Sequence, residues 1–160
     1  MNTHTLTWYR AELDYDIASE AWILYDAHQN LEPHLRHQIA DLTTGENRNR
    51  ISRLLAEAFA EVVRAIGKNG ATRLRREDSL HAPKGYRLRL TIPDHAVMPL
   101  VERVHAFLIA RVLGRALINL LPTEAARFAK EGDSRLEAIA AAALSFSLRG
   151  ATLRRPLSPF

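Results

Sequence analysis

Two histidines and two carboxylates lie close together near the end of the first quarter of the chain. His34 and His37 are three residues apart, and Glu32 and Asp41 flank them. On a helix this spacing would bring two imidazoles near a carboxylate, a set of ligands that zinc accepts. The sequence lacks an HExxH motif, however, and a three-residue spacing alone is a weak zinc signal. We therefore expect a solvated helix face here, with no metal and no cofactor.

Other patterns that commonly carry catalysis are weaker still. Asp94 and His95 are adjacent, but an aspartate at this point is better interpreted as the N-cap of the helix that follows it. The sequence contains no GxSxG motif, no Walker loop and no glycine pattern typical of dinucleotide binding. Cysteine is absent, which excludes disulfides and thiolate metal sites. We therefore predict that the protein is not an enzyme.

Arginine is the residue type whose spacing points to binding. Two segments, ATRLRRED and GYRLRLTIP, alternate arginine with other residues, which predicts a β-hairpin with SLHAPK as its loop. Its outer face would carry like charges opposite each other, and phosphates or a partner's carboxylates would relieve the repulsion. The alternative, a charged edge that guards against aggregation, stays open. The arginines concerned are Arg73, Arg75, Arg87 and Arg89.

A second arginine cluster lies at the predicted start of a long helix. The segment NRNRISR places three cations near a helix N-terminus, where the helix macrodipole disfavours each of them by about 0.3–1 kcal/mol. Such a cost would be tolerated if these arginines contacted a partner. We favour the alternative that the helix begins earlier, at Thr43, and that Glu46 offsets the dipole. The three candidates are Arg48, Arg50 and Arg53.

Arg111 and Arg115 continue the apolar face of a helix predicted over residues 97–121. Arginine cannot lose its charge to become buried, so each side chain needs a carboxylate or a route to water. We interpret both as structural ion pairs, within the chain or with an adjacent subunit. The candidate partners are Glu57, Glu61, Asp14, Asp16 and Glu20.

Charge is distributed unevenly along the chain. Residues 1–46 carry two arginines against eight carboxylates, a net charge of −6, whereas residues 47–89 carry eleven basic residues against four acidic ones, a net charge of +7. The net charge of the whole chain is +4. The two parts could pair within one molecule or head to tail between identical subunits, or they could be solvated faces of opposite sign.

The hydrophobic periodicity predicts a mainly α fold of the α+β type, with a long central helix and a small antiparallel hairpin. We expect a strand over 3–13, a helix from Asp16, and helices over 33–42, 43–66 and 94–121. A further helix should end at Gly132 and the last should begin at Ser134. Residues 1–148 would form one domain, and 149–160 an extended basic tail with two prolines and the candidate contacts Arg154 and Arg155.

The membrane is not expected to be a partner. The most apolar segment, 97–121, is interrupted by charged residues, which argues against a membrane span. The N-terminal residues show no basic region followed by an apolar one, so we expect no secretory signal. We therefore expect a soluble protein.

The order of these elements resembles that of small virion structural proteins of tailed phages and prophages, in particular head–tail connector or neck components. The segments that carry the resemblance are TWYRAELDYDIASEAW, YRLRLTIPD and VERVHAFLIARVLGRAL, and together they span most of the chain. The resemblance implies a non-enzymatic, mainly helical subunit that binds other subunits, forms a homo-oligomeric ring around DNA and resides in the virion. No motif exists onto which a functional residue could be carried.

The alternative is a nucleic-acid-binding or regulatory protein that uses the arginine-rich hairpin face on the DNA backbone. Such a protein would reside in the bacterial cytoplasm. No helix–turn–helix signature supports it, because no clear recognition helix follows a short glycine turn.

Overall fold

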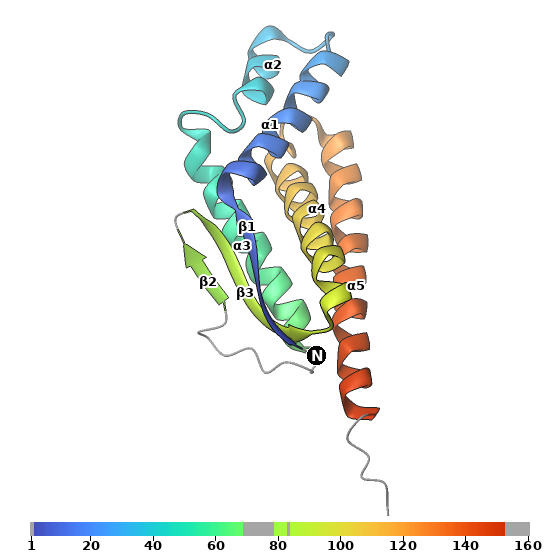
Figure 1. The fold of residues 1–160 in the computed structure, drawn as a ribbon. Coiled ribbons are helices and arrows are strands. Elements are labelled where there is room, and N and C mark those ends of the chain that lie inside the picture. Colours follow the sequence, from blue (N-terminus) through green and yellow to red (C-terminus); the bar gives the residue numbers. More distant parts are fainter. Residues whose placement is uncertain (1, 69–78, 83, 153–160) are drawn as a thin grey trace, which may run out of the picture.

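The computed structural model describes residues 2–68, 79–82 and 84–152. Within this part of the chain the predicted fold class is confirmed: helices dominate, and a small antiparallel sheet packs against them (Figure 1). The elements are β1 (Asn2–Tyr9), α1 (Arg10–Ala27), α2 (Pro33–Ala40), α3 (Asn47–Lys68), β2 (Ser79–Ala82), β3 (Gly85–Ile92), the 3₁₀ helix η2 (Asp94–Ala96), α4 (Val97–Ala116) and α5 (Pro122–Thr152).

The sheet has the strand order β1-β3-β2, and both pairs of strands are antiparallel. Apolar residues alternate with polar ones along β1 and β3, so the sheet has one buried and one open face. On the buried face Leu6 pairs with Leu88, and Trp8 with Tyr86. The Trp8 indole also donates a hydrogen bond of 3.0 Å to the carbonyl oxygen of Val101. The sheet is thereby fixed to α4.

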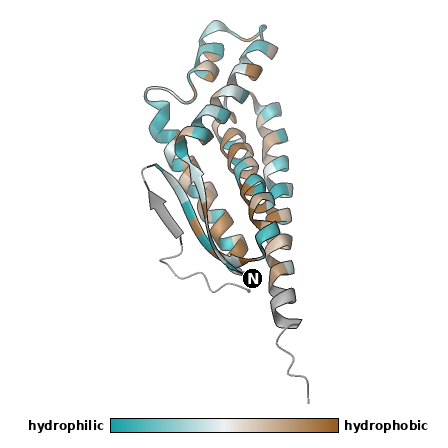
Figure 2. Ribbon diagram, viewed as in Figure 1, coloured by the Kyte–Doolittle hydropathy of each residue, from teal (hydrophilic) through white to brown (hydrophobic). Residues whose placement is uncertain are grey.

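Helix α4 is the centre of the core, as the sequence predicts. Its residues Val104, Phe107 and Leu108 are fully excluded from solvent. It packs against α3 and α5, and much of its ribbon has the colour of hydrophobic residues (Figure 2). The apolar residues of α3 that belong to the same core cluster include Ile51, Leu55, Phe59 and Val62.

The first helix begins earlier than the sequence pattern predicts. Strand β1 ends at Tyr9 and α1 starts at Arg10, so Asp16 lies inside the helix and does not cap it. The helical spacing of buried residues already includes Leu13, one turn before Ile17. The threonines and aromatic residues of residues 3–9 favour a strand, and they hide the point at which the spacing of apolar residues changes from that of a strand to that of a helix.

The last helix is continuous where the sequence predicts a break. Residues around Gly132 stay helical because α5 packs along α4 over this whole stretch, and that packing outweighs the cost of about 1 kcal/mol for a glycine in a helix. Helix α4 ends at Ala116 and not at 121, since residues 117–120 form a turn. Residues 149–152 belong to α5, so this part of the predicted extended tail is helical; residues 153–160 lie outside the described part.

The hairpin is also shifted from its predicted position. The segment expected to be a loop contains β2, which pairs with β3 in a register that places Leu80 opposite Arg87. The predicted first strand of the hairpin, residues 71–78, lies outside the described residues. Gly85 makes the close approach of β3 to β1 feasible, since a Cβ there would lie 2.2 Å from the carbonyl oxygen of Trp8.

Candidate partner-binding surface

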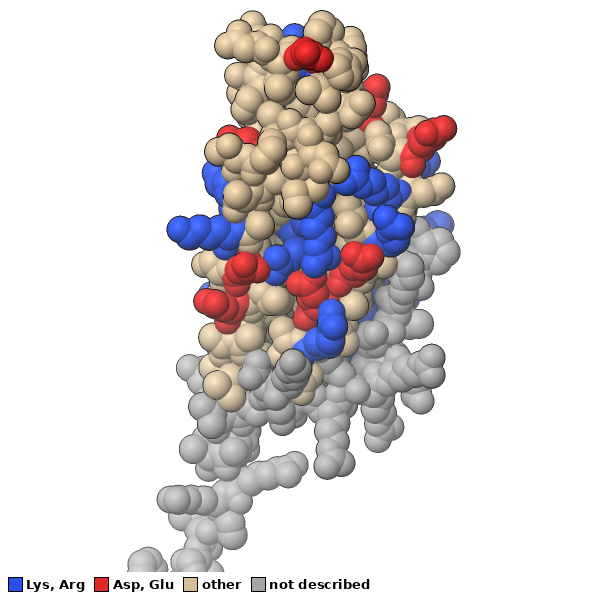
Figure 3. Space-filling model, turned by 180° about the vertical axis from the view of Figure 1, so that it is seen from behind, with Lys and Arg blue, Asp and Glu red and all other residues tan. Residues whose placement is uncertain are grey.

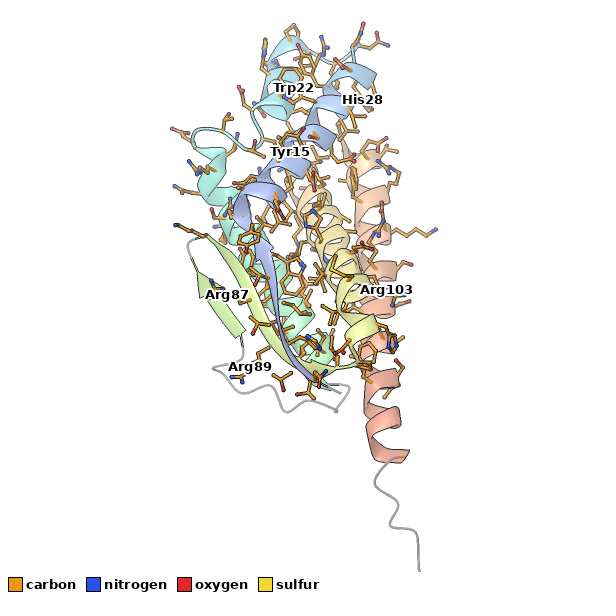
Figure 4. All side chains as sticks on the ribbon, in the orientation of Figure 1. Tyr15, Trp22, His28, Arg87, Arg89 and Arg103 are labelled. Carbon is orange, nitrogen blue, oxygen red and sulfur yellow. The ribbon has the colours of Figure 1, made fainter. Side chains whose placement is uncertain are left out.

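Arg87 and Arg89 stand on the open face of the sheet, as their alternation in β3 predicts. Both side chains are exposed (Figure 4). Tyr86, Leu88 and Leu90, between and beside them, are buried. Neither arginine forms an ion pair or a side-chain hydrogen bond with a residue that the structure describes. Two guanidinium groups are therefore available to a partner.

The cross-strand neighbours of these arginines that the structure describes are neutral. Thr7 of β1 lies opposite Arg87, and Thr5 lies opposite Arg89. On the β2 side, Leu80 lies opposite Arg87. The expected repulsion between facing arginines is therefore absent from the described part of the sheet; Arg73 and Arg75 lie outside it.

The open face of the sheet carries hydrogen-bond donors, and none of its described residues is a carboxylate. It is formed by the outward residues of β1 together with Arg87 and Arg89. Thr3 and Thr91 at its end hydrogen-bond to each other through their hydroxyls at 3.1 Å. Guanidinium groups bind carboxylates and phosphates with planar, paired hydrogen bonds. The face can thus bind an anionic surface, of a protein or of a nucleic acid.

The arginines at the start of α3 have different surroundings. The helix begins at Asn47, so the prediction that it begins at Thr43 is wrong. Arg50 donates hydrogen bonds of 3.5 Å to the carbonyl oxygens of Arg115 and Ala116, where α4 ends. A cation at this position stabilises the carbonyl end of a helix.

The other two arginines of this cluster point to solvent. The Nε of Arg53 lies 4.0 Å from Glu57, an exposed pair of little energetic weight. Arg48 is exposed, and its side chain contacts no carboxylate in the described part of the chain. Arg154 and Arg155 lie outside the described residues.

Arg111 and Arg115 contact carboxylates that the sequence analysis names. Arg111 Nε lies 3.2 Å from Glu61 Oε2, and Arg115 contacts both Glu61 and Glu57. Asp133 of α5, a partner that the sequence did not suggest, lies 2.9 Å from Arg111 Nη2. Basic and acidic side chains alternate across the middle of the rear face (Figure 3). This network joins α3, α4 and α5 and uses the arginines structurally.

The histidines show no sign of a shared site. His34 is largely exposed and lies 3.3 Å from Glu32, and His37 points to solvent nearby. No group of three or more His, Asp or Glu side chains in the described residues is arranged to hold a metal ion.

Two histidine–aspartate pairs were missed by the sequence analysis. His105 Nε2 lies 2.6 Å from Asp16 and joins α4 to α1. Asp94 Oδ1 lies 2.9 Å from His4 Nε2 and accepts a hydrogen bond of 2.9 Å from Asn2. Asp94 thus ties β1 to η2, and its side chain makes no capping hydrogen bond. No local signal could reveal these pairs, because their members are about ninety residues apart in the chain.

Comparisons with models of protein families, with curated proteins and with solved structures found no significant match. In the described part of the chain, none of the helices combines the length and the apolarity needed to cross a membrane.

Proposed function

We propose that the protein is a non-enzymatic assembly subunit, similar in role to a phage head–tail connector or neck protein. It binds an acidic surface of a neighbouring subunit through Arg87 and Arg89. The proposal rests on two exposed guanidinium groups on the open face of the sheet. The other described side chains of that face carry no negative charge that would compensate them.

A protein partner fits this face better than duplex DNA. A protein whose binding to DNA depends strongly on charge contacts about 6–10 phosphates, whereas the described sheet face carries only two arginines. Stacking on single-stranded bases needs a row of aromatic rings, and along β3 the one ring, Tyr86, is buried. The same chain, in contrast, has an N-terminal part with a net charge of −6, which a second copy could present.

The double variant Arg87→Gln/Arg89→Gln tests the proposal. Its mass in solution should be measured by sedimentation velocity, and its binding to a DNA duplex by fluorescence anisotropy, both at low and at high salt. Arg103→Gln/Lys130→Gln is the matched control, since both of these cations are exposed and unpaired among the described residues and lie on α4 and α5.

We expect the test variant to lose self-association while the control keeps it and no protein binds the duplex. Loss of duplex binding with unchanged mass would instead support the nucleic-acid alternative. Salt alone cannot separate the two, because both contacts weaken as ionic strength rises. If neither property changes, the arginines only guard a sheet edge and the proposal is wrong.

A further inference from the structure

Helix α1 exposes large apolar side chains on the face opposite the core. Tyr15 is 73% exposed, Trp22 52% and Ile23 60%. Tyr15 and Trp22 are seven residues apart, so two turns of helix bring them to the same side (Figure 4). Exposed apolar side chains that gather on one face mark interaction sites more often than scattered ones do.

Two carboxylates extend this row of rings. Glu12 lies one turn before Tyr15 and Asp26 one turn after Trp22, so both share the outward face of α1 by helical spacing. Both are exposed, and neither forms an ion pair with any described residue. We call this set of five residues, Glu12, Tyr15, Trp22, Ile23 and Asp26, the α1 stripe.

The charge of the α1 stripe restricts what can cover it. Its carboxylates would repel the phosphates of nucleic acids and of anionic lipids, which attract basic segments. A cation with a flat apolar surface suits it better, because guanidinium groups stack on aromatic rings and pair with carboxylates at the same time.

Arginine–aromatic stacking is already used within this chain. The guanidinium carbon of Arg36 lies 4.0 Å from the ring centroid of Tyr25, next to Trp22 on α1. The guanidinium carbon of Arg127 lies 4.2 Å from the ring centroid of Phe128 on α5. The rings of Tyr15 and Trp22 have no such arginine in the described part of the chain.

We infer that the α1 stripe of one copy binds β3 of a second copy, with Arg87 and Arg89 stacked on Trp22 and Tyr15. Glu12 and Asp26 supply the opposite charge. This inference rests on the proposed function, and it names the partner surface that the proposal leaves open.

The spacing of the two surfaces is compatible. Tyr15 and Trp22 are about 10 Å apart along the helix axis, and Arg87 and Arg89 about 7 Å apart along the strand, a difference that two long arginine side chains can span. The two surfaces are different parts of the chain, so the contact is head to tail. A pair keeps one free strand on one copy and one free stripe on the other, which allows further copies to add and a ring to close.

Mixing two variants tests this arrangement directly. Tyr15→Ala/Trp22→Ala removes the stripe and keeps the arginines, whereas Arg87→Gln/Arg89→Gln does the reverse. We expect each variant alone to be monomeric by sedimentation velocity. Their equimolar mixture should form a one-to-one dimer and nothing larger, because only one stripe and one strand in each pair are intact.

Two further variants make the result unambiguous. Glu12→Lys/Asp26→Lys reverses the charge of the stripe without removing a ring, and it should also be monomeric. Met98→Ala/Ile118→Ala removes exposed apolar side chains elsewhere and should keep the mass of the unaltered protein. Circular dichroism checks that every variant is folded.

The outcomes separate this inference from the proposed function. If the stripe variants keep the mass of the unaltered protein while Arg87→Gln/Arg89→Gln becomes monomeric, the inference is overturned and the proposed function stands. If the arginine variant also keeps that mass, both fail. A mixture that forms no dimer, or an unaltered protein that is monomeric at every concentration, overturns the inference as well.

Discussion

Glu61 of α3 and Arg111 of α4 form an ion pair at 3.2 Å in a nearly buried position. The Glu61 side chain is 16% exposed and that of Arg111 is 12% exposed. Arg111 also contacts Asp133 of α5, so one guanidinium group joins three helices. Its Nε–H has no hydrogen-bond acceptor in line among the described residues, so the contact with Glu61 is chiefly electrostatic.

Replacing Arg111 by alanine should therefore cost about 2–3 kcal/mol of unfolding free energy, because the largely buried Glu61 would lose one of its two guanidinium partners and keep only the more exposed Arg115. Arg115 is 38% exposed, and Arg115→Ala should cost only about 1 kcal/mol. Urea unfolding measures both values, with Arg103→Ala as the control for loss of an exposed arginine. Costs for Arg111 and Arg115 that agree within about 0.5 kcal/mol would contradict this interpretation.

The arginine positions show how far sequence reasoning reaches at the site. Period-2 alternation placed Arg87 and Arg89 on the open face of the sheet, because a strand has only two faces and the apolar one must be buried. The helical wheel likewise placed Arg111 at the edge of the core. It could not reveal Asp133, because the crossing of α4 and α5 depends on tertiary packing.

The errors in the predicted elements have a common physical cause. At Gly132 and at residues 79–82 the packing of neighbouring elements determines the structure, and the local residue types alone indicate a different one. A glycine predicts a helix end only where no neighbouring helix holds the chain, and a four-residue strand is too short for its alternation to stand out. The sequence indicates the buried face of α1 correctly, because Ile17, Ala21 and Leu24 share a helical face. It could not show that Tyr15, Trp22 and Ile23 stay exposed on the other side, since that depends on which elements pack against α1.

Val104→Asp should prevent folding. Val104 is fully excluded from solvent at the centre of α4, and an aspartate there would place an unpaired charge in the core. Far-UV circular dichroism and the yield of protein in the supernatant measure the effect, with Met98→Asp on the exposed side of the same helix as the control. A well-folded Val104→Asp protein would show that the core is packed differently.

Two glycines in the helices should respond to substitution in opposite directions. A Cβ at Gly114 would lie 3.0 Å from the backbone nitrogen of Ala129, so Gly114→Val should push α4 and α5 apart and cost about 1–3 kcal/mol. A Cβ at Gly132 would meet Arg111 at an ordinary 3.6 Å, so Gly132→Ala should stabilise α5 by about 0.5–1 kcal/mol. Thermal unfolding followed by circular dichroism compares them. Stabilisation by both substitutions would rule out the close approach at Gly114.

Acid should weaken the tie between β1 and η2. The hydrogen bond from Asn2, and then that from His4, hold the pKa of the Asp94 carboxyl below its ordinary value. The folded form therefore binds a proton at Asp94 less readily than the unfolded form does. The resulting stabilisation is present above the unfolded pKa, near 4, and is lost as pH falls through the folded pKa.

Asp94→Asn should thus lower the unfolding temperature at pH 7 but make that temperature less sensitive to acid. Plots of unfolding temperature against pH for the variant and the unaltered protein should therefore converge below about pH 4. Glu102→Gln is the control, because Glu102 is an exposed carboxylate without an ion pair among the described residues, and its curve should follow that of the unaltered protein. The measurement is the unfolding temperature from pH 7 down to pH 3. A constant gap between the Asp94→Asn curve and that of the unaltered protein over this range would show that the carboxylate contributes nothing through its charge.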